Sequence, residues 1–362
     1  MRAVILVGGE ATRLRPITCD IPKAMVPVLN TPFLEHLIRY LSQHRIDDII
    51  LAQGHPQQPI ESYFGDGSQF GVRLSYSIED TPLGTAGAVK NAERYLDETF
   101  LVLNGDIFTD LDITAMIASH LERKAKITIA LTPVDNPTSY GLVETNARGR
   151  VTRFLEKPRW SQVTTYMINA GTYVMEPDVL AYISPQANFS FERELFPPLL
   201  DQGEPVYAYP SPAYWIDIGT LEKYLRLHQD LLTGKSSRYA LAPGEEVLIG
   251  DQSYIHPTAQ IKGPVVIGSS CTIGQNVRLI GPLVIGAGCE ILPEAVVEES
   301  IIWRNTRLGQ HVNLKGSIVA DNCCLNANSI IEDSALGHDV TVASSSKLEP
   351  GSKIWPGITV PK

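Results

Sequence analysis

The stretch IHPTAQIKGPVVIGSSCTIGQNVRLIGPLVIGAGCEILPEAVV, residues 255–297, carries an apolar residue at every sixth position. The recurring residues are Ile255, Ile261, Ile267, Ile273, Leu279, Ile285, Ile291 and Val297. The residue four places after each of them is small or apolar as well. A six-residue period is typical of a left-handed parallel β-helix, in which three hexapeptides form one triangular coil of about eighteen residues and the recurring residue points inward. The sequence therefore predicts a β-helix.

The period slips after Val297, yet it continues in three further runs to the end of the chain. The later members are Ile302, Leu308, Leu314, Val319, Leu325, Ile331, Leu336, Val342, Leu348 and Ile354. We therefore predict a β-helix domain over residues 251–362. Cys271 and Cys289 lie eighteen residues apart, so we expect them to stack in adjacent coils as buried thiols. The Pro-containing residues 347–362 are expected to cap the helix or to pack against a catalytic domain.

The preceding two-thirds of the chain alternates short apolar runs with helical periodicity. The apolar runs, which we predict to be strands, are 3–7, 49–52, 72–76, 100–103, 127–131, 142–144, 151–155 and 170–174. The predicted helices are 32–43, 84–96, 113–122 and 219–235. Buried apolar strands joined by crossover helices indicate a Rossmann-like, doubly wound α/β fold. We predict a catalytic domain over 1–234 and a linker over 235–250.

Composition excludes several classes of protein. The net charge of the 362 residues is −10, which disfavours nucleic acid because phosphates need a basic surface. The longest apolar stretches are too short to span a bilayer, so we expect no membrane segment. The five cysteines show no paired spacing and no secretory signal precedes them, so we expect reduced thiols and a cytoplasmic protein.

The loop LVGGEATRLRP, residues 6–16, follows the first predicted strand directly. Backbone N–H groups at Gly8 and Gly9 can cradle phosphate oxygens, and Arg13 and Arg15 add planar cations that bind phosphate in a forked geometry. The loop lacks the Gly-Lys-Ser/Thr of a Walker loop and the Gly-x-Gly-x-x-Gly of a dinucleotide site. Lys23 follows in IPKAMVPV, where flanking prolines stiffen the chain.

Seven motifs then occur in one order along residues 1–232. They are GGEATRLRP (8–16), PKAMVPV (22–28), PLGTAGA (82–88), LNGD (103–106), EKP (156–158), NAG (169–171) and WIDIG (215–219). Together they resemble the sugar-1-phosphate nucleotidyltransferases, also called nucleotide-sugar pyrophosphorylases. FERELFP (191–197) and the β-helix tail most resemble the mannose-1-phosphate guanylyltransferases among them. Ala11 departs from the family loop, which usually has Gly there.

The resemblance implies a reaction in which a sugar-1-phosphate oxygen attacks the α-phosphorus of a nucleoside triphosphate and expels pyrophosphate. It assigns catalysis to Arg13, Lys23, Asp106 and Asp217, of which the two aspartates would hold Mg²⁺. Nucleotide binding falls to Leu6, Gly8, Gly9, Glu79, Gly84 and Thr85. Sugar-phosphate binding falls to Gly141, Glu156, Lys157 and Asn169.

The substrates that we expect are GTP and mannose-1-phosphate. The resemblance implies that the stretch before PLGTAGA lines the base pocket, and here that stretch carries Glu79 and Asp80, whose carboxylates can accept from the N1 and N2 donors of guanine. The alternatives are a uridylyl-, thymidylyl- or adenylyltransferase of glucose-1-phosphate, or a catalytically silent regulatory subunit. A third is an acyltransferase with His311 or His338 as base, but the nearly unbroken repeat leaves no room for the long loop that such an enzyme needs. We expect the β-helix to join subunits into a homo-oligomer.

Overall fold

Strand β1 (Arg2–Leu6) lies inside a mixed sheet in the computed structural model, which describes residues 1–9, 11–54, 58–239 and 246–362. Its neighbours β4 (Asp48–Gln53) and β6 (Phe100–Asn104) run parallel to it on either side. Most of the residues in these three strands are buried apolar residues. A strand needs that composition when helices cover both faces of its sheet.

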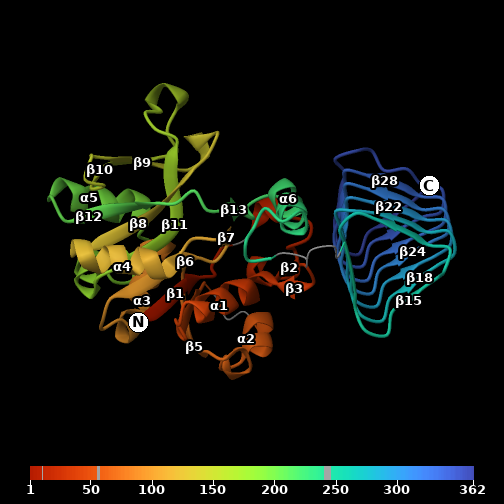
Figure 1. Cartoon of the computed structure of the whole chain (residues 1–362), viewed down its shortest axis with the longest axis horizontal. Helices are drawn as coiled ribbons and strands as arrows, with labels where there is room; N and C mark the ends of the chain where they lie inside the picture. The colour runs from red at the N-terminus through yellow and green to blue at the C-terminus, as the bar shows by residue number, and fades with distance from the viewer. Residues whose placement is uncertain (10, 55–57, 240–245) are drawn as a thin grey trace. The chain divides into compact units, whose positions relative to one another are not determined.

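The sheet continues beyond these strands with both parallel and antiparallel pairs (Figure 1). Its order is β10-β9-β11-β6-β1-β4-β5, and β8 pairs with β11 and β12. The further strands are β5 (Arg73–Ile78), β8 (Ile127–Pro133), β9 (Gly141–Thr145), β10 (Val151–Glu156), β11 (Met167–Met175) and β12 (Val206–Pro210). The antiparallel pairing of β11 with β6 makes the sheet mixed, as predicted.

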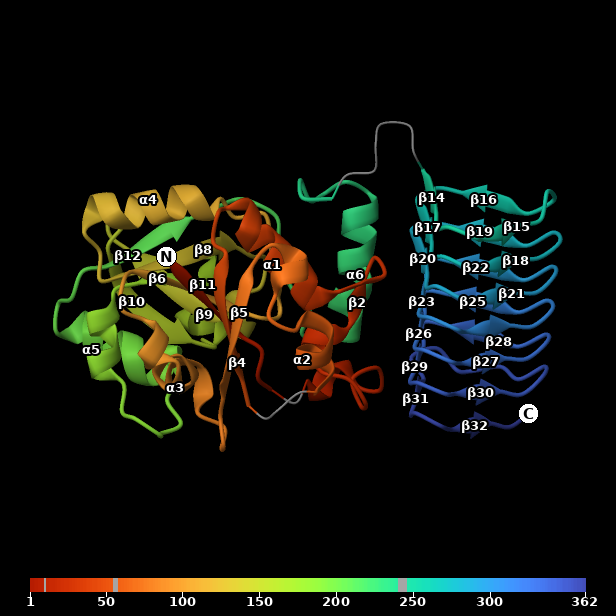
Figure 2. The same cartoon turned by 90° about the horizontal axis from the view of Figure 1, so that it is seen from below.

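Helices cover both faces of this sheet, with α4 on one side and α3 and α5 on the other (Figure 2). The helices are α1 (Phe33–Gln43), α2 (Gln58–Phe64), α3 (Gly84–Asn91), α4 (Ile113–Arg123), α5 (Phe196–Asp201) and α6 (Leu221–Leu232). Asp112 caps α4 by accepting the Ala115 N–H at 2.9 Å. In the described part of the chain, no helix is long and apolar enough to cross a membrane. The doubly wound α/β prediction is confirmed.

The chain divides into two compact units that do not follow the sequence order. Unit 1 comprises Met1–Gly9 and Leu34–Trp215, and unit 2 comprises Glu10–Phe33 and Ile216–Lys362. Unit 2 therefore contains the 3₁₀ helix η2 (Lys23–Met25), the short strands β2 (Pro27–Val28) and β3 (Thr31–Pro32), α6 and the β-helix. The strand β13 (Trp215–Asp217) crosses the division. Within the predicted linker, residues 240–245 lie outside the described residues.

The β-helix consists of three parallel sheets whose short strands repeat along the chain (Figures 1 and 2). The first sheet contains β14 (Val247–Ile249), β17 (Val265–Ile267), β20 (Leu283–Ile285), β23 (Ile301–Ile302), β26 (Ile318–Val319), β29 (Ala335–Leu336) and β31 (Lys353–Ile354). The second contains β15 (Tyr254–Ile255), β18 (Thr272–Ile273), β21 (Glu290–Ile291), β24 (Arg307–Leu308), β27 (Cys324–Leu325), β30 (Thr341–Val342) and β32 (Thr359–Val360). The third contains β16 (Gln260–Lys262), β19 (Arg278–Ile280), β22 (Val296–Glu298), β25 (Asn313–Lys315) and β28 (Ile330–Glu332). The predicted β-helix is confirmed, and it begins with β14.

The slip in the six-residue period lies at one corner of the coil. Ile267 pairs with Ile285, eighteen residues on, but Ile285 pairs with Ile302, only seventeen residues on. The shorter corners carry a column of buried serines, Ser300, Ser317 and Ser334. The hydroxyl of Ser300 accepts the Ser317 N–H at 3.1 Å, and that of Ser317 accepts the Ser334 N–H at 3.1 Å. Each hydroxyl donates to the carbonyl two residues before it, at 2.7 Å. The serine column therefore replaces backbone pairing at the shortened corner.

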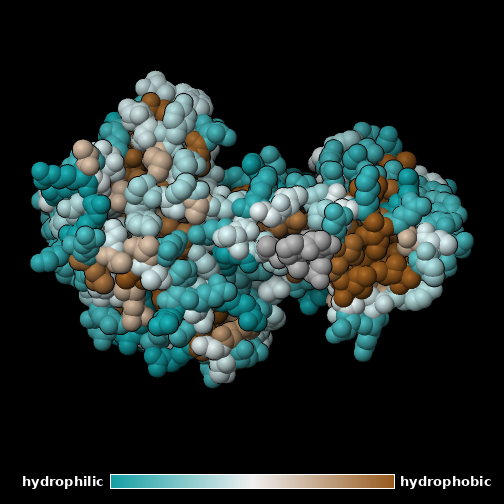
Figure 3. Space-filling model, viewed as in Figure 1, coloured by the Kyte–Doolittle hydropathy of each residue, from teal (hydrophilic) through white to brown (hydrophobic). Residues whose placement is uncertain are grey.

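Apolar residues of the inner column are only partly buried at both ends of the β-helix, including Ile354 and Val360 of the last coil. Val247, Ile255 and Ile261 of the first coil are only partly buried, and apolar atoms gather at this end of the coil in Figure 3. At the other end, β31 and β32 pair with β29 and β30 and extend the coil. Residues 347–362 therefore add two further sides to the coil, and their expected packing against a catalytic domain stays a prediction. Cys271 and Cys289 are buried in the inner column, as predicted.

Candidate active site

Gly8 and Gly9 follow β1 at the carboxyl edge of the sheet, where ligands of α/β proteins bind. The N–H of Val7 donates to the Ala52 carbonyl at 2.8 Å and extends the pairing of β1 by one residue. Beyond Val7 both glycines are exposed. Glu10 lies outside the described residues. Leu6 is the last residue of β1, and its carbonyl accepts the Gly105 N–H at 2.9 Å. This bond holds the loop that carries Asp106 against the end of β1.

The segment that runs from the end of β5 into α3 holds three further predicted nucleotide-binding residues, Glu79, Gly84 and Thr85. The Leu83 N–H donates to Glu79 Oε2 at 2.8 Å, and the Glu79 side chain is buried. Gly84 has φ +71°, and a Cβ there would lie 2.8 Å from the Phe189 carbonyl oxygen. Only glycine suits both this conformation and this space. Thr85 is the second residue of α3, and its hydroxyl accepts the Phe191 N–H at 3.0 Å.

Glu192 also contacts this segment, although the sequence did not indicate it. It lies in a π-helix, Phe191–Leu195, and Thr85 Oγ1 donates to Glu192 Oε2 at 3.3 Å. Burial raises the pKa of the Glu192 carboxyl, and the charge of Glu156 adds to the rise. Such π-helical turns occur often at functional sites. FERELFP contains Glu192, but its spacing gave no sign that the glutamate turns toward Thr85.

Gly141 and Glu156 face each other across an antiparallel pair, at the first residue of β9 and the last of β10. A Cβ on Gly141 would lie 2.4 Å from Phe154 Cζ and 3.1 Å from Glu156 Oε2, so a side chain would displace both. Lys157 follows with φ +48°, and its Nζ lies 3.8 Å from Glu156 Oε1. The lysine side chain is 63% exposed, as a cation that binds a diffusing phosphate must be.

Asn169 in β11 has an orientation fixed by two hydrogen bonds. Its Nδ2 donates to the Tyr173 hydroxyl at 2.7 Å, and its Oδ1 accepts the Gly171 N–H at 3.0 Å. Burial raises the pKa of the fully buried Tyr173. An amide has a second N–H and a second lone pair, so Asn169 can still bind a hydroxyl. Tyr173 is a further supporting residue that the sequence did not indicate.

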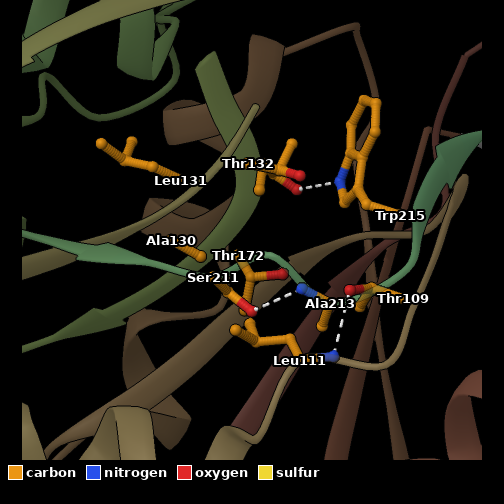
Figure 4. Close-up of a pocket in the computed structure, with 10 residues that line it drawn as sticks. Thr109, Leu111, Ala130, Leu131, Thr132, Thr172, Ser211, Ala213 and Trp215 are labelled. Atoms are coloured by element: carbon orange, nitrogen blue, oxygen red, sulfur yellow. Dashed lines mark hydrogen bonds between the residues drawn. The ribbon is translucent and has the colours of Figure 1, made fainter. Parts of the chain in front are cut away.

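A small cavity lies behind this strand (Figure 4). Its lining includes Thr109, Thr132 and Thr172, and Trp215 Nε1 donates to the Ala170 carbonyl beside it at 3.0 Å. Its volume of about 10 Å³ has room for one water molecule and not for a sugar. The cavity is therefore too small to be the substrate site.

Unit 2 brings two further predicted residues together around Gly219. A Cβ on Gly219 would lie 2.6 Å from Asp217 Oδ1 and 3.1 Å from Arg13 Nη2. The Gly219 N–H donates to Asp217 Oδ1 at 3.0 Å, and Lys223 Nζ forms an ion pair with Asp217 Oδ2. Arg13 and Asp217 thus meet at one glycine, although about 200 residues separate them in the chain.

The backbone conformation of Ala11 explains why the family usually has glycine at this position. It has φ +47°, a left-handed conformation that costs a residue with a Cβ about 1–2 kcal/mol. Its carbonyl accepts the Leu14 N–H and the Thr18 hydroxyl, both at 3.0 Å. These bonds hold the loop in its conformation despite the methyl group. The departure therefore affects the backbone rather than the space for a ligand.

The two carboxylates predicted to hold Mg²⁺ belong to different units. Asp106 follows β6 and is partly exposed, and Asp217 ends β13. Mg²⁺ prefers oxygen ligands and keeps several waters, so two carboxylates suit it. Asp217 already accepts from Gly219 and Lys223, but a carboxylate has about four lone-pair sites. The described residues contain no group of three or more His, Cys, Asp or Glu side chains that could hold a metal ion without substrate.

Comparison with known families agrees with this arrangement. Residues 2–234 match the nucleotidyl transferase family, residues 246–281 match the bacterial transferase hexapeptide repeats, and residues 279–360 match the GMPPB C-terminal domain. The chain belongs to the nucleotidyl transferase family.

Its relatives cover both parts of the chain. It is 37% identical over 345 residues to a UTP--glucose-1-phosphate uridylyltransferase from Synechocystis, covering 90% of this chain and 89% of the relative. It is 35% identical over 367 residues to a mannose-1-phosphate guanyltransferase from Pichia angusta, covering 98% and 96%. The structure of HddC from Yersinia pseudotuberculosis complexed with GMP-PN matches with a TM-score of 0.54 at 33% identity, over 62% of this chain and 97% of that one.

Proposed function

We propose that this protein transfers GMP from GTP to mannose-1-phosphate and releases GDP-mannose and pyrophosphate. The sugar phosphate oxygen forms a bond to the α-phosphorus of GTP, and the bond from that phosphorus to the bridging oxygen of pyrophosphate breaks. The match to the Pichia guanyltransferase along the whole chain supports this reaction. The cytoplasm is its proposed compartment, in keeping with five free thiols.

The observation that carries the choice of base is the position of Glu79. Its carboxylate, fixed by the Leu83 N–H at 2.8 Å, is an acceptor-only group in the segment before PLGTAGA. Guanine offers two adjacent donors, N1–H and N2–H, whereas uracil offers one donor between two acceptors. A carboxylate accepts more than one donor, so its bond to Leu83 is compatible with reading guanine.

Each of the other predicted residues is assigned to one group of the substrates. Arg13 binds the departing pyrophosphate and Lys23 the phosphates at the reacting centre. Lys157 binds the phosphate of the sugar. Glu156, Asn169 and the Gly141 backbone bind the sugar hydroxyls. Mg²⁺ held by Asp106 and Asp217 neutralises phosphate charge when bound.

One assay tests the proposal. Pyrophosphate release is measured for GTP, UTP, dTTP and ATP, each with mannose-1-phosphate and with glucose-1-phosphate. We expect the highest kcat/KM for GTP with mannose-1-phosphate. A higher value for UTP with glucose-1-phosphate would instead favour the activity named for the Synechocystis relative.

Two variants sharpen the choice of base. Glu79→Gln replaces one acceptor by a donor, and we expect the GTP-to-UTP ratio of kcat/KM to fall about 10- to 100-fold. Asp80→Asn changes the exposed neighbour and serves as the matched control. An equal ratio in both variants would remove Glu79 from base recognition.

We also propose a homo-oligomer formed through the β-helix. Ile249 and Tyr254 of the first coil are exposed by 52% and 56%. Light scattering of the full chain should give a multiple of its 39.7 kDa, and the double variant Ile249→Lys/Tyr254→Lys should lower it. A single-chain mass for the unmodified protein would contradict the proposal.

A further inference from the structure

The segment that carries Lys23 ends in a strained hairpin. After η2, strands β2 and β3 pair through the two residues Leu29 and Asn30, whose φ angles are +47° and +67°. Positive φ at both central residues matches a type I′ turn, which favours Asn and Gly. Leu29 in this conformation costs about 1–2 kcal/mol. Such strain persists only where surrounding contacts hold it. We call residues 23–32 the lysine arm.

One contact on the lysine arm comes directly from the β-helix. Asn30 Nδ2 donates to the carbonyl of Ile285, the last residue of β20, at 2.9 Å. The same carbonyl accepts the Gly268 N–H at 2.8 Å from the preceding coil. A carbonyl oxygen has two lone pairs. The Gly268 N–H binds one of them within the β-helix, and Asn30 of the lysine arm binds the other. The turn that holds the strain is therefore bonded to β20.

A second contact passes through α6. The Tyr224 hydroxyl donates to the Pro27 carbonyl, and Trp303 Nε1 donates to that hydroxyl at 3.1 Å. Indole N–H is only a donor, so the hydroxyl oxygen must accept it and its own hydrogen must go to Pro27. The directions of both bonds are thus fixed. Tyr224 is fully buried and Trp303 is 2% exposed, so neither bond competes with bulk water.

Trp303 breaks the repeat at the place where it makes this contact. The residue that follows each strand of the first sheet is Gly250, Gly268, Gly286, Trp303, Ala320, Gly337 or Trp355. A Cβ on Gly286 would lie 2.6 Å from the Trp303 backbone, so space for side chains in this column is narrow. Trp303 packs edge-to-face against Tyr224 at 6.4 Å and against His338 at 5.4 Å. Of the two tryptophans in the column, Trp355 at the last coil is half exposed, whereas Trp303 is buried and meets the tyrosine that holds the arm.

We propose that the β-helix positions Lys23, with Trp303, Tyr224 and Asn30 as positioning residues. The inference rests on the proposed function, which assigns Lys23 to the phosphates. The backbone between Pro27 and Lys23 is short and stiff. The Val26 N–H donates to the Lys23 carbonyl at 3.2 Å, and Pro22 and Pro27 fix φ at the two ends of this segment. A shift at Pro27 therefore moves the backbone of Lys23. The tail is then part of the catalytic scaffold as well as a surface for assembly.

The test uses the full chain and two variants that keep an aromatic ring at each position. Tyr224→Phe removes the bond to Pro27 and the acceptor of Trp303, and Trp303→Phe removes the N–H donor together with one of the two fused rings. A displacement of about 1 Å can cost about 100-fold in rate, so we expect kcat to fall about 10- to 100-fold in Tyr224→Phe. KM for the sugar phosphate should change much less, because Lys157 and Glu156 lie in unit 1.

A double-mutant cycle tests whether the Trp303–Tyr224 hydrogen bond acts on the lysine arm only through the Tyr224–Pro27 hydrogen bond. If Trp303 acts only through the Tyr224 hydroxyl, Tyr224→Phe/Trp303→Phe should have the kcat of Tyr224→Phe alone. Losses that multiply would show that Trp303 acts on the site by another route and would overturn the series arrangement.

Val342→Ala separates positioning from stability. Val342 is fully buried in β30, so this variant destabilises the β-helix core without touching Trp303 or the arm. It should keep the kcat of the unmodified protein. If it loses as much as Tyr224→Phe, the effect is structural and the proposal fails.

Hydrogen exchange gives a readout that does not depend on activity. Amides of residues 23–33 should exchange faster in Tyr224→Phe and Trp303→Phe than in Val342→Ala. Faster exchange with no turnover of any substrate pair by the unmodified protein would contradict the proposed function but keep the coupling of the arm to the β-helix. Unchanged exchange in both variants would overturn the coupling itself.

Discussion

The mixed sheet of unit 1 and the β-helix of unit 2 both rely on parallel strands but bury them differently. Strands of the sheet such as β1, β4 and β6 are five or six residues long, and helices cover both faces. Strands of the β-helix are two or three residues long, and the coil itself encloses the core. In the sheet, each strand end is unique and can carry one chemical group. In the β-helix, every coil repeats the same positions, so a special role requires a departure from the repeat.

The largest expected effect tests Asp106, which follows β6 of the sheet, and Asp217, which ends β13. Asp106→Asn and Asp217→Asn should each lower Mg²⁺-dependent kcat by at least about 10²–10³-fold, because an amide keeps the shape and loses the charge. Turnover is measured over a Mg²⁺ titration, with circular dichroism as the check on folding. Asp112→Asn is the matched control, since Asp112 caps α4 and Asn caps about equally well. Near-normal turnover of a folded Asp106→Asn protein would exclude that carboxylate from the mechanism.

A pair of core substitutions separates stability from activity. Leu314→Ala in β25 and Leu103→Ala in β6 each remove a buried side chain and should cost about 2–5 kcal/mol of unfolding free energy. Only Leu103→Ala should also lower the kcat of the folded protein, because Leu103 lies three residues before Asp106. Denaturant unfolding and kcat are measured on both. An equal loss of kcat in Leu314→Ala would mean that the β-helix core acts on the site as a whole.

The serine column predicts a smaller effect confined to the β-helix. Ser317→Ala removes a hydroxyl that bonds to Ser334 N–H and to the Lys315 carbonyl, both in a buried corner. We expect a loss of about 1–3 kcal/mol in thermal unfolding. Ser352→Ala, at a half-exposed serine, should change stability by less than half of that. Equal Tm values for the two variants would show that the column contributes nothing.

The smallest expected effect is a pH dependence of the stability of unit 1. Burial lowers the pKa of His120 below its ordinary value of 6.5, and a hydrogen bond from its ring to Glu176 only partly offsets this. Below pH 6.5 the unfolded chain takes up a proton that the folded chain resists, so stability should fall as pH falls below that value. His120→Gln should flatten the slope of Tm between pH 5 and 7.

Much of the fold could be predicted from the sequence because both regions carry strong periodicities. The inner column from Ile255 to Val342 could be read directly, since an enclosed coil admits only apolar residues there. The buried strands of the sheet were predicted to within a few residues for the same reason. By contrast, α2 and β12 were not predicted, because each is short and its apolar pattern does not distinguish it from a loop.

Site residues could be predicted only where a sequence motif contains them. Predicted residues such as Asp106, Glu156 and Asn169 lie at strand ends or in strands of the sheet, whereas their roles remain predictions. Glu192 and Tyr173 were not found, because their contacts depend on a π-helical turn and on the packing of β11. The contact of Trp303 with Tyr224 joins residues 79 positions apart, and no local pattern encodes it.

The change from eighteen to seventeen residues per coil has a consequence for how this tail can evolve. In an ordinary strand the loss of one residue turns every later side chain to the opposite face. Here the missing residue lies at a corner, between Glu298 and Ile302, and the inner column resumes in phase at Ile302. Ser300 and its successors supply the bonds that the shortened corner needs. The coil thus tolerates a change of length that would scramble a sheet, and whole coils can be gained or lost without redesigning those on either side.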